Sequence, residues 1–383
     1  MMRVQVIVAG FVAVLVGFAS SVAIVLQAAT AAGATASQMT SWVSVLGFVM
    51  GITCLGFSWY YKAPVLTAWS TPGAALLATA LSGHSMAQAV GVFMFSGLLT
   101  LLLGLSGWFD RLSKWLPLPL AQAMLAGVLL QFGLQLFKVA PDDPLLLALA
   151  LVLFVVGRLR WPRYNIPLIL LASCLWCAWS GQLQVQQLSW QWPAWHWVTP
   201  EFSWQACLGI GLPLFIVTMT SQNLPGVAVL KSYHYEVPVS PVLNVTGGLM
   251  LLLAPFGNFS LNLAAITAAI CAGPEAHPEA AKRYQAGMAA GMFYLLTGLA
   301  GASIVTLFLT FPQTLIAVIA GLALVATISA NLSAATAEGP YRDAATLTLL
   351  TTASGVSLLG VSSAFWGLLV GICTLLLQRV RQV

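Results

Sequence analysis

Charge is what this sequence has least of. Only 6 % of its 383 residues are Asp, Glu, Lys or Arg, whereas 60 % are hydrophobic, and the mean hydropathy is +0.94. A soluble domain of this length cannot cover its surface with so few charges. We therefore expect an integral membrane protein embedded in a lipid bilayer. The basic residues are scattered in ones and twos, which argues against a nucleic-acid partner.

Groups that do chemistry are also scarce inside the apolar runs. No nucleophile–base pair and no cluster of metal ligands falls within one of them, so the sequence predicts no enzyme, no metal site and no cofactor. Cys174 and Cys177 form a C-x-x-C motif. Their apolar neighbours favour buried packing residues over a redox or metal-binding pair.

What the chain has in abundance is apolar runs long enough to cross a bilayer, which takes about 20 residues each. We predict an all-α membrane protein of fourteen spans. The first seven fall in residues 1–180, a Trp-rich extracytoplasmic loop follows at 181–202, and the second seven fall in 203–383. The tryptophans of this loop are typical of an interfacial segment, with a ligand-binding aromatic cage as the alternative.

The placement of positive charge predicts the orientation. With the N-terminus in the cytoplasm, thirteen of the fourteen Lys and Arg residues fall on the cytoplasmic side, and only Lys138 falls outside. This bias follows the positive-inside rule, so both termini are expected to be cytoplasmic. Because seven is an odd number, corresponding spans of the two halves run in opposite directions, which is the inverted repeat of many secondary transporters.

Two of the predicted spans are interrupted. Span three contains Trp-Ser-Thr-Pro-Gly at 69–73, where Thr71 is predicted to be an N-cap and Pro72 the first residue of a helix that begins near the bilayer midplane. Span ten has a matching break at 258–262, where Asn262 is predicted to be an N-cap. Non-helical backbone at that depth occurs only where protein buries it or where it lines a cavity.

Two helix N-termini that face each other would form an anion site without lysine or arginine. Polar residues of spans one and eight would complete the pocket, and Trp69 and Phe259 would stack on an aromatic ligand. The predicted substrate-binding residues are Ser20, Ser21, Gln27, Trp69, Ser70, Thr71, Gly73, Ser221, Gln222, Asn223, Phe259, Ser260 and Asn262. The alternatives are kinks that only pack helices, and hydrogen bonds between helices.

At these residues the sequence resembles the benzoate–proton symporter (BenE) family. The motifs are AWSTPGAAL at 68–76, SQNLPG at 221–226, NLAAITAAI at 262–270, GPEAHP at 273–278 and SAFWG at 363–367. The family shares its fold with the nucleobase–ascorbate and sulfate-type transporters. The resemblance implies a core of spans 1–4 and 8–11, a gate of spans 5–7 and 12–14 that often forms a homodimer contact, and elevator-like movement of core against gate. It also implies uptake of a small aromatic carboxylate such as benzoate, with protons, across the bacterial inner membrane.

One departure from related families bears on the substrate. Nucleobase transporters place glutamates in the eighth and tenth spans, where this chain has Ser221–Asn223 and Ser260–Asn262. An anion is therefore favoured over a neutral heterocycle, and a nucleobase or another small organic anion is the alternative. Glu275 and His277, at the cytoplasmic end of span ten, are the predicted proton-coupling residues. The alternatives are a solvated loop and a proton that travels on the substrate.

Overall fold

A computed structural model describes residues 4–19, 21–109, 117–138, 140–161, 165–182, 192–356, 358 and 363–380, and these residues are almost entirely helical. Within them, seven helices are long and apolar enough to cross a membrane. The number rises to eight if residues 280–309, which bend by 61° at Ala300, form one further span. The structure therefore confirms a multi-span helical protein, and several of the predicted spans contain shorter helices.

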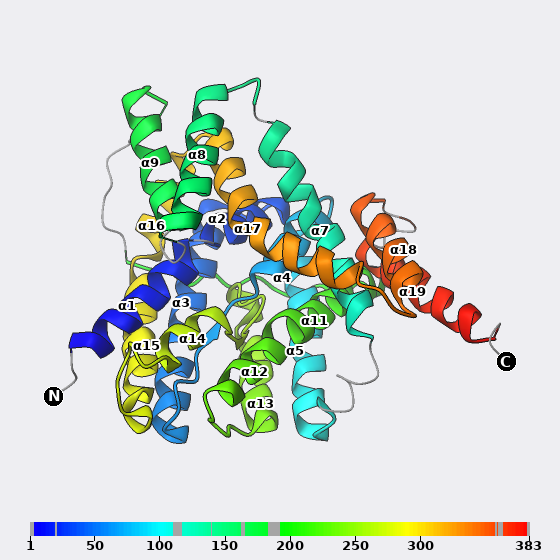
Figure 1. Cartoon of the computed structure of the whole chain (residues 1–383), viewed down its shortest axis with the longest axis horizontal. Coiled ribbons are helices and arrows are strands. Elements are labelled where there is room, and N and C mark those ends of the chain that lie inside the picture. Colours follow the sequence, from blue (N-terminus) through cyan, green and yellow to red (C-terminus); the bar gives the residue numbers. More distant parts are fainter. Residues whose placement is uncertain are drawn as a thin grey trace.

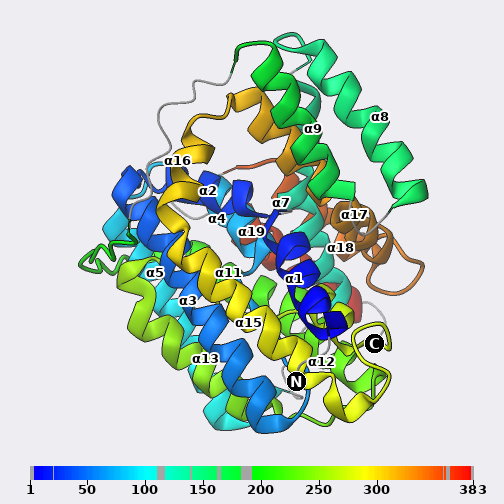
Figure 2. The same ribbon diagram turned by 90° about the vertical axis from the view of Figure 1, so that its left-hand side faces the viewer.

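One group of helices packs through close backbone contacts. The helix α3 (Ala36–Tyr61) runs along α15 (Tyr284–Leu299), and α5 (Met86–Ser106) runs along α13 (Val239–Leu253). A Cβ atom placed on Gly47 of α3 would lie only 2.5 Å from the backbone nitrogen of Gly298 in α15. Small residues let helix backbones approach this closely. Such packing holds helices together within a bilayer, where the hydrophobic effect does not drive their association. Figure 2 shows α3, α13 and α15 as long rods side by side.

A second group forms around α7 (Leu118–Lys138) and α17 (Gln313–Ala335), which pack along each other. The helices α18 (Arg342–Ala353) and α19 (Ser363–Val380) lie against α7, and α8 (Pro144–Arg160) and α9 (Asn165–Trp179) form a hairpin that contacts α17. Figure 1 shows α7, α8, α9 and α17 in one half of the view and α5, α12 and α13 in the other.

The remaining elements are two short strands and several helices and turns. They are α1 (Val4–Ala19), α2 (Val22–Ala31), β1 (Thr67–Ala68), α4 (Thr71–Ala80), α10 (Trp204–Ala206), the π-helical turn η2 (Cys207–Gly211), α11 (Leu212–Thr218), the π-helical turn η3 (Met219–Asn223), α12 (Leu224–Ser232), the 3₁₀ turn η4 (Ala254–Phe256), β2 (Asn262–Leu263), α14 (Ile266–Ala272), the 3₁₀ turn η5 (Ala280–Lys282) and α16 (Gly301–Leu309).

The two strands meet in the interior as an antiparallel pair, with Thr67 opposite Leu263 and Ala68 opposite Asn262. The Ala264 N–H donates to the carbonyl of Leu66 at 2.9 Å and extends the pair by one hydrogen bond. Strand backbone at this depth needs such pairing because buried peptide groups without partners are costly. The helices α4 and α14 begin a few residues after the two strands.

The described part of the Trp-rich segment, residues 192–203, contains no helix or strand, and its backbone donates hydrogen bonds to residues of α3, α5 and η4. The Val198 N–H donates to the Pro255 carbonyl at 2.9 Å. The rings of Trp195 and Trp197 pack on Phe256, with centroids 5.7 Å and 5.3 Å away. Both tryptophans are also about half exposed, so neither ring is fully enclosed by protein.

The hairpin of α8 and α9 is held at one end by a buried carboxylate. Asp143 caps α8 by accepting from the Leu146 N–H at 2.9 Å, and its other oxygen accepts from Gln182 at 3.0 Å and from the Trp176 indole at 3.4 Å. Burial alone would raise the pKa of this carboxyl, but the hydrogen bonds favour the ionised form more strongly, and the pKa lies below its usual range.

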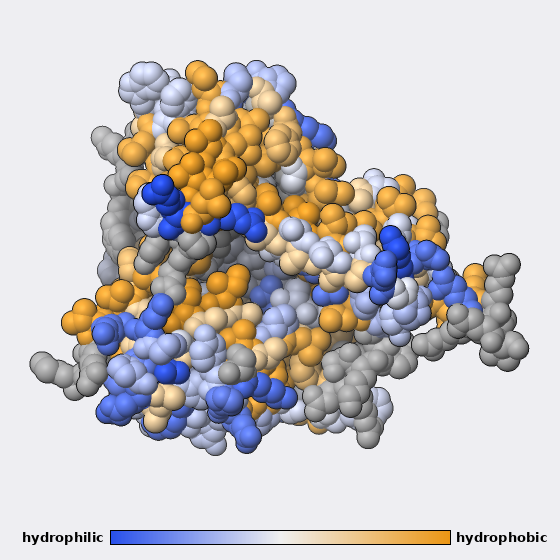
Figure 3. Space-filling view, viewed as in Figure 1, coloured by the Kyte–Doolittle hydropathy of each residue, from blue (hydrophilic) through white to orange (hydrophobic). Residues whose placement is uncertain are grey.

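The surface has the character expected in a bilayer. Figure 3 shows apolar side chains over the α8–α9 hairpin and hydrophilic ones gathered near the ends of α12, α13 and α15. Large apolar side chains stand exposed on the hairpin: Leu145, Val152, Val155, Leu159, Leu171 and Leu175. The same face of the molecule is hollowed below α17 (Figure 3).

Candidate substrate site

A cavity of about 350 Å³ lies between the first turns of α4 and α14 and the paired helices α7 and α17. This volume is within the usual range for small-molecule sites, roughly 300–1,000 Å³. The polar residues of the wall are Ser21, Trp69, Thr71, Gln122, Thr220, Ser221, Gln222, Thr267, Tyr294, Thr327 and Asn331. Among the described lining residues none is charged, so any ligand charge must be met by dipoles.

The start of α4 differs by one residue from the prediction. Ser70, not Thr71, is the N-cap: its backbone is extended, and its hydroxyl accepts from the Gly73 N–H at 2.9 Å. The Ala74 N–H bonds to the Ser70 carbonyl at 2.8 Å, and Pro72 has no N–H. Of the first four N–H groups, the one at Thr71 is left for a ligand, together with the Thr71 hydroxyl at the cavity wall.

The start of α14 differs by more. Asn262 was predicted to be its N-cap, but it lies in β2, and its side chain bonds locally to the Ser260 hydroxyl and the Leu263 carbonyl, both at 3.1 Å. The helix begins at Ile266, and no side chain caps its first turn. Residues 264–267 line the cavity, and the Ala264 N–H is already bonded to Leu66, so the available N–H groups of this break lie at 265–267 rather than at Asn262.

Trp69 is fixed by a short chain of hydrogen bonds. Its indole N–H donates to the Ser21 hydroxyl at 2.8 Å, and that hydroxyl donates to the Gly17 carbonyl at 2.7 Å. The indole also packs against Phe18, with ring centroids 5.1 Å apart. Both Trp69 and Ser21 line the cavity, whereas the neighbouring Ser20 lies outside the described residues.

The three predicted site residues of the π-helical turn η3 have different places. The Ser221 hydroxyl lines the cavity but bonds to the Val217 carbonyl of its own helix at 2.6 Å. The Gln222 side chain also lines the cavity. Asn223 does not: it is buried, and its oxygen accepts from the Leu263 N–H at 3.0 Å, which holds β2 in place.

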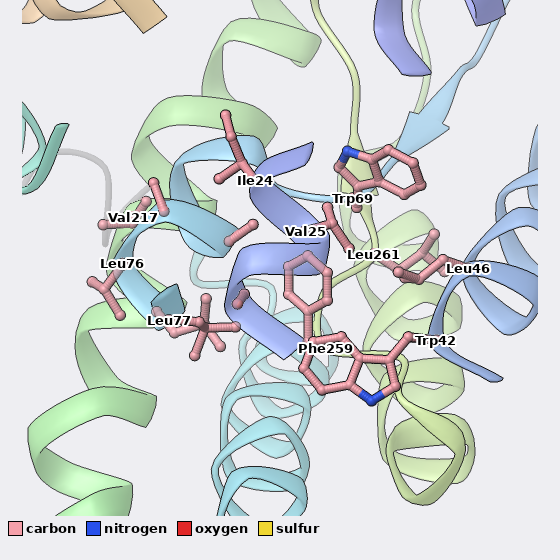
Figure 4. Close-up of a cluster of buried hydrophobic side chains, with 14 of the residues drawn as sticks. Ile24, Val25, Trp42, Leu46, Trp69, Leu76, Leu77, Val217, Phe259 and Leu261 are labelled. Carbon is pink, nitrogen blue, oxygen red and sulfur yellow. The ribbon is translucent and has the colours of Figure 1, made fainter. Parts of the chain in front are cut away.

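Other predicted site residues lie away from this cavity. Gln27 lines a second cavity of about 380 Å³ between α2 and the pair α7 and α17. Phe259 is fully buried, and its ring lies against Trp42 and Phe93 rather than against Trp69 (Figure 4). Gly73 and Ser260 are buried and do not line the first cavity.

The two predicted proton-coupling residues also lie outside both cavities, in the loop between α14 and η5. Glu275 is exposed, whereas His277 is 2 % exposed, so a solvated loop does not describe its surroundings. The ring nitrogen Nδ1 of His277 accepts from the Glu279 N–H at 3.0 Å. The guanidinium of Arg283 closes the loop by donating to the carbonyls of Ala272 and His277.

Residues 1–377 match the family model described as "Benzoate membrane transport protein", BenE. The chain belongs to the BenE family. It is 44 % identical over 375 residues to the inner membrane protein YdcO of Escherichia coli K12, covering 98 % of this chain and 96 % of that one. It is 38 % identical over 364 residues to the benzoate membrane transport protein of Acinetobacter baylyi, covering 95 % and 92 %.

Two solved structures share the fold of this BenE-family chain. The transmembrane domain of the cyanobacterial bicarbonate transporter BicA matches with a TM-score of 0.57 and 16 % identity, over 99 % of this chain and 98 % of that one. The structure of SLC26A9 matches with a TM-score of 0.66 and 14 % identity, over 98 % and 66 %. The BenE-family chain is therefore a multi-pass inner-membrane transport protein, not an enzyme.

The BenE-family cavity contains six polar residues that the sequence reasoning missed: Gln122 of α7, Thr220 of η3, Thr327 and Asn331 of α17, Thr267 of α14 and Tyr294 of α15. Gln122 and Asn331 carried a readable signal, because amides inside apolar spans are costly without a partner. Nothing in the local pattern marked Tyr294, since a tyrosine in a span is most often packing.

Proposed function

We propose that this protein is a secondary transporter that imports an aromatic carboxylate such as benzoate. The observation that carries the proposal is the character of the cavity: its wall combines apolar and polar residues, it has no charged side chain among its described lining residues, and it includes residues from the first turns of two helices and a buried indole. Such a site suits an anion with an apolar ring. The family and the relative named as a benzoate transporter support the same choice.

In this proposal the ligand has two ends. The carboxylate accepts from the Thr71 N–H and hydroxyl, from the Gln222 amide and from the backbone N–H groups of residues 265–267. Hydrogen bonds to a charged acceptor are worth about 1.5–3 kcal/mol each when water is excluded. The ring lies against the Trp69 indole, which Ser21 holds in one orientation.

The transport cycle we propose is an elevator. The chain would form fourteen spans in two inverted repeats, residues 1–180 and 203–383, with the Trp-rich loop between them and both termini in the cytoplasm. Spans 1–4 and 8–11 would carry the ligand past a gate of spans 5–7 and 12–14, through which two copies would pair. The position of the cavity supports this division, because α1, α4 and α14 line one side and α7 and α17 the other.

Protons would accompany the substrate. The cavity has no titratable carboxylate or imidazole among its described lining residues, so the proton would be carried either by groups outside the cavity or by the substrate, which would then enter as the neutral acid. Glu275 and His277 are the alternative carriers, at the end of α14. The two routes are separated by measuring uptake into proteoliposomes under a pH gradient. The wild type is compared with the double variant Glu275→Gln and His277→Gln.

The test of the function is ligand binding by the purified protein. Benzoate should raise the thermal unfolding midpoint and give a measurable Kd, whereas uracil and xanthine should do neither. Thr71→Val should weaken benzoate binding by roughly tenfold or more, the equivalent of one lost hydrogen bond to a charge. The matched control is Thr100→Val, because Thr100 is buried in α5 outside the cavity. Binding of a nucleobase with no response to benzoate would overturn the proposal.

A further inference from the structure

The proposed function leaves the second cavity, of about 380 Å³, without a role. This cavity lies where α2, α4 and α7 end and α17 begins, and its volume is within the usual range for small-molecule sites, roughly 300–1,000 Å³. Thr71 lines the first cavity and Thr79 the second, about 12 Å apart along α4. The two cavities are therefore far enough apart to hold one small ligand each.

Glutamine dominates the polar part of this second wall. The four glutamines that line it are Gln27 of α2, Gln131 and Gln135 of α7, and Gln313 of α17. Within the described part of the chain, none of their side-chain amides hydrogen-bonds to another residue. The two threonines of the wall are different, because Thr30 and Thr79 donate to the carbonyls of Leu26 and Leu76, both at 2.9 Å. Amides in membrane helices are costly without a partner, so these four need water or a ligand in the cavity.

The chemistry of the wall suits a carboxyl group attached to an apolar ring. No charged side chain is among the described lining residues. Each glutamine amide offers two N–H donors and a carbonyl acceptor, so it can donate to a carboxylate or exchange two hydrogen bonds with a protonated acid. Apart from the two threonines, the rest of the wall is apolar: Ala31, Ala78, Phe308, Ile316, Ala317 and Ala320. The second cavity thus combines amides, apolar surface and one aromatic ring, as the first cavity does.

We propose that the second cavity binds a second molecule of the transported aromatic carboxylate. Its carboxyl group bonds to the amides of Gln131 and Gln135, which lie one turn apart on the same face of α7, and its ring lies against Phe308. The inference rests on the proposed function, which supplies the class of ligand. In the proposed orientation α2 and α4 end on the extracytoplasmic side, so the molecule held there is the next one to be transported. The site raises the local supply of substrate at low external concentrations and is not needed at saturating ones.

A thiol placed in the second cavity measures its occupancy. Thr79→Cys leaves all four glutamines in place, because the Thr79 hydroxyl bonds only within its own helix. The variant is made with Cys373→Ser, purified and labelled with a maleimide, and the label at position 79 is followed by peptide mass spectrometry. Saturating benzoate should slow this labelling by roughly tenfold, because the thiol reacts only while the site is empty. Ser82→Cys is the matched control, since Ser82 is exposed just after α4 and lines neither cavity, and benzoate should not change its labelling.

Two added substitutions separate the second site from the first. Gln131→Leu combined with Gln135→Leu should abolish the protection, and leucine is well tolerated in a membrane helix, so benzoate should still bind in the first cavity. Thr71→Val weakens the first cavity and should leave the benzoate concentration for half-protection unchanged. If that concentration rises with Thr71→Val, the protection is transmitted from the first cavity, and the inference is overturned while the proposed function stands. Binding of benzoate to the wild type without any protection at position 79 has the same meaning. If benzoate does not bind the wild type at all, the proposed function itself fails.

Discussion

At the scale of single residues, the decisive contact is the one between Ser21 and Trp69. The indole N–H is buried and has the Ser21 hydroxyl as its acceptor at 2.8 Å. Ser21→Ala leaves that N–H unpaired, which costs about 1–3 kcal/mol, and it frees the indole to tilt. We expect a thermal unfolding midpoint roughly 2–4 °C lower and weaker benzoate binding.

A double-mutant cycle isolates this contact. In a Trp69→Phe background there is no N–H to satisfy, so adding Ser21→Ala should cost less than half as much in unfolding temperature. Ser96→Ala is the control for losing a buried serine hydroxyl, because Ser96 has no partner and its removal leaves no group unpaired. Equal losses in both backgrounds would show that Ser21 acts through something other than the indole.

At the scale of elements, the sequence predicted features that depend on neighbouring residues and missed features that depend on contacts between distant ones. Proline and hydroxyl residues at 70–72 marked the break before α4 to within one residue. The start of α14 was misplaced because Asn262 satisfies its own side chain locally, which no propensity rule reveals. The pairing of β1 with β2 joins residues about two hundred positions apart, and no local pattern encodes such a register.

The turn η3 makes the difference between binding and supporting residues testable. The turn is π-helical, which is common at functional sites, and it contains two adjacent amide residues with different roles. Gln222 lines the cavity, whereas Asn223 holds the Leu263 N–H of β2. Asn223→Ala should lower the unfolding temperature and speed amide exchange at Leu263, because a buried N–H loses its acceptor at a cost of about 1–3 kcal/mol.

Gln222→Ala serves as the neighbouring comparison. It should weaken benzoate binding by roughly tenfold, the equivalent of about 1.4 kcal/mol, and leave the unfolding temperature close to that of the wild type. The two variants should therefore show opposite patterns in stability and affinity. If Gln222→Ala destabilised the fold and Asn223→Ala only weakened binding, the assignment of the two amides would have to be exchanged.

At the scale of the whole molecule, two cavities follow one another along the same surface of α7 and α17. The first cavity is lined by Gln122 and Asn331, and the second is lined by Gln131 and Gln313, farther along the same two helices. The apolar pattern was enough to predict a multi-span membrane protein, and the family motifs indicated transport. They did not reveal these gate-side amides, because the packing of one half against the other decides which residues of a span face a cavity.

This stacking leads to a prediction about movement. Gln27 belongs to α2, on the proposed core, and it shares the second cavity with Gln131 and Gln313 of the proposed gate. A reducible cross-link between cysteines at 27 and 131 should stop benzoate uptake while leaving binding intact, because it ties core to gate. A cross-link between cysteines at 131 and 313 joins two gate helices and should leave uptake unchanged.

The exposed native Cys373 is first replaced by serine, so that the cross-linking reagent reacts only with the chosen pair. Restoration of uptake by a reductant shows that the loss came from the tether. If the cross-link between 27 and 131 still allows full uptake, core and gate do not slide past each other, and a local opening of α7 and α17 would have to release the substrate instead.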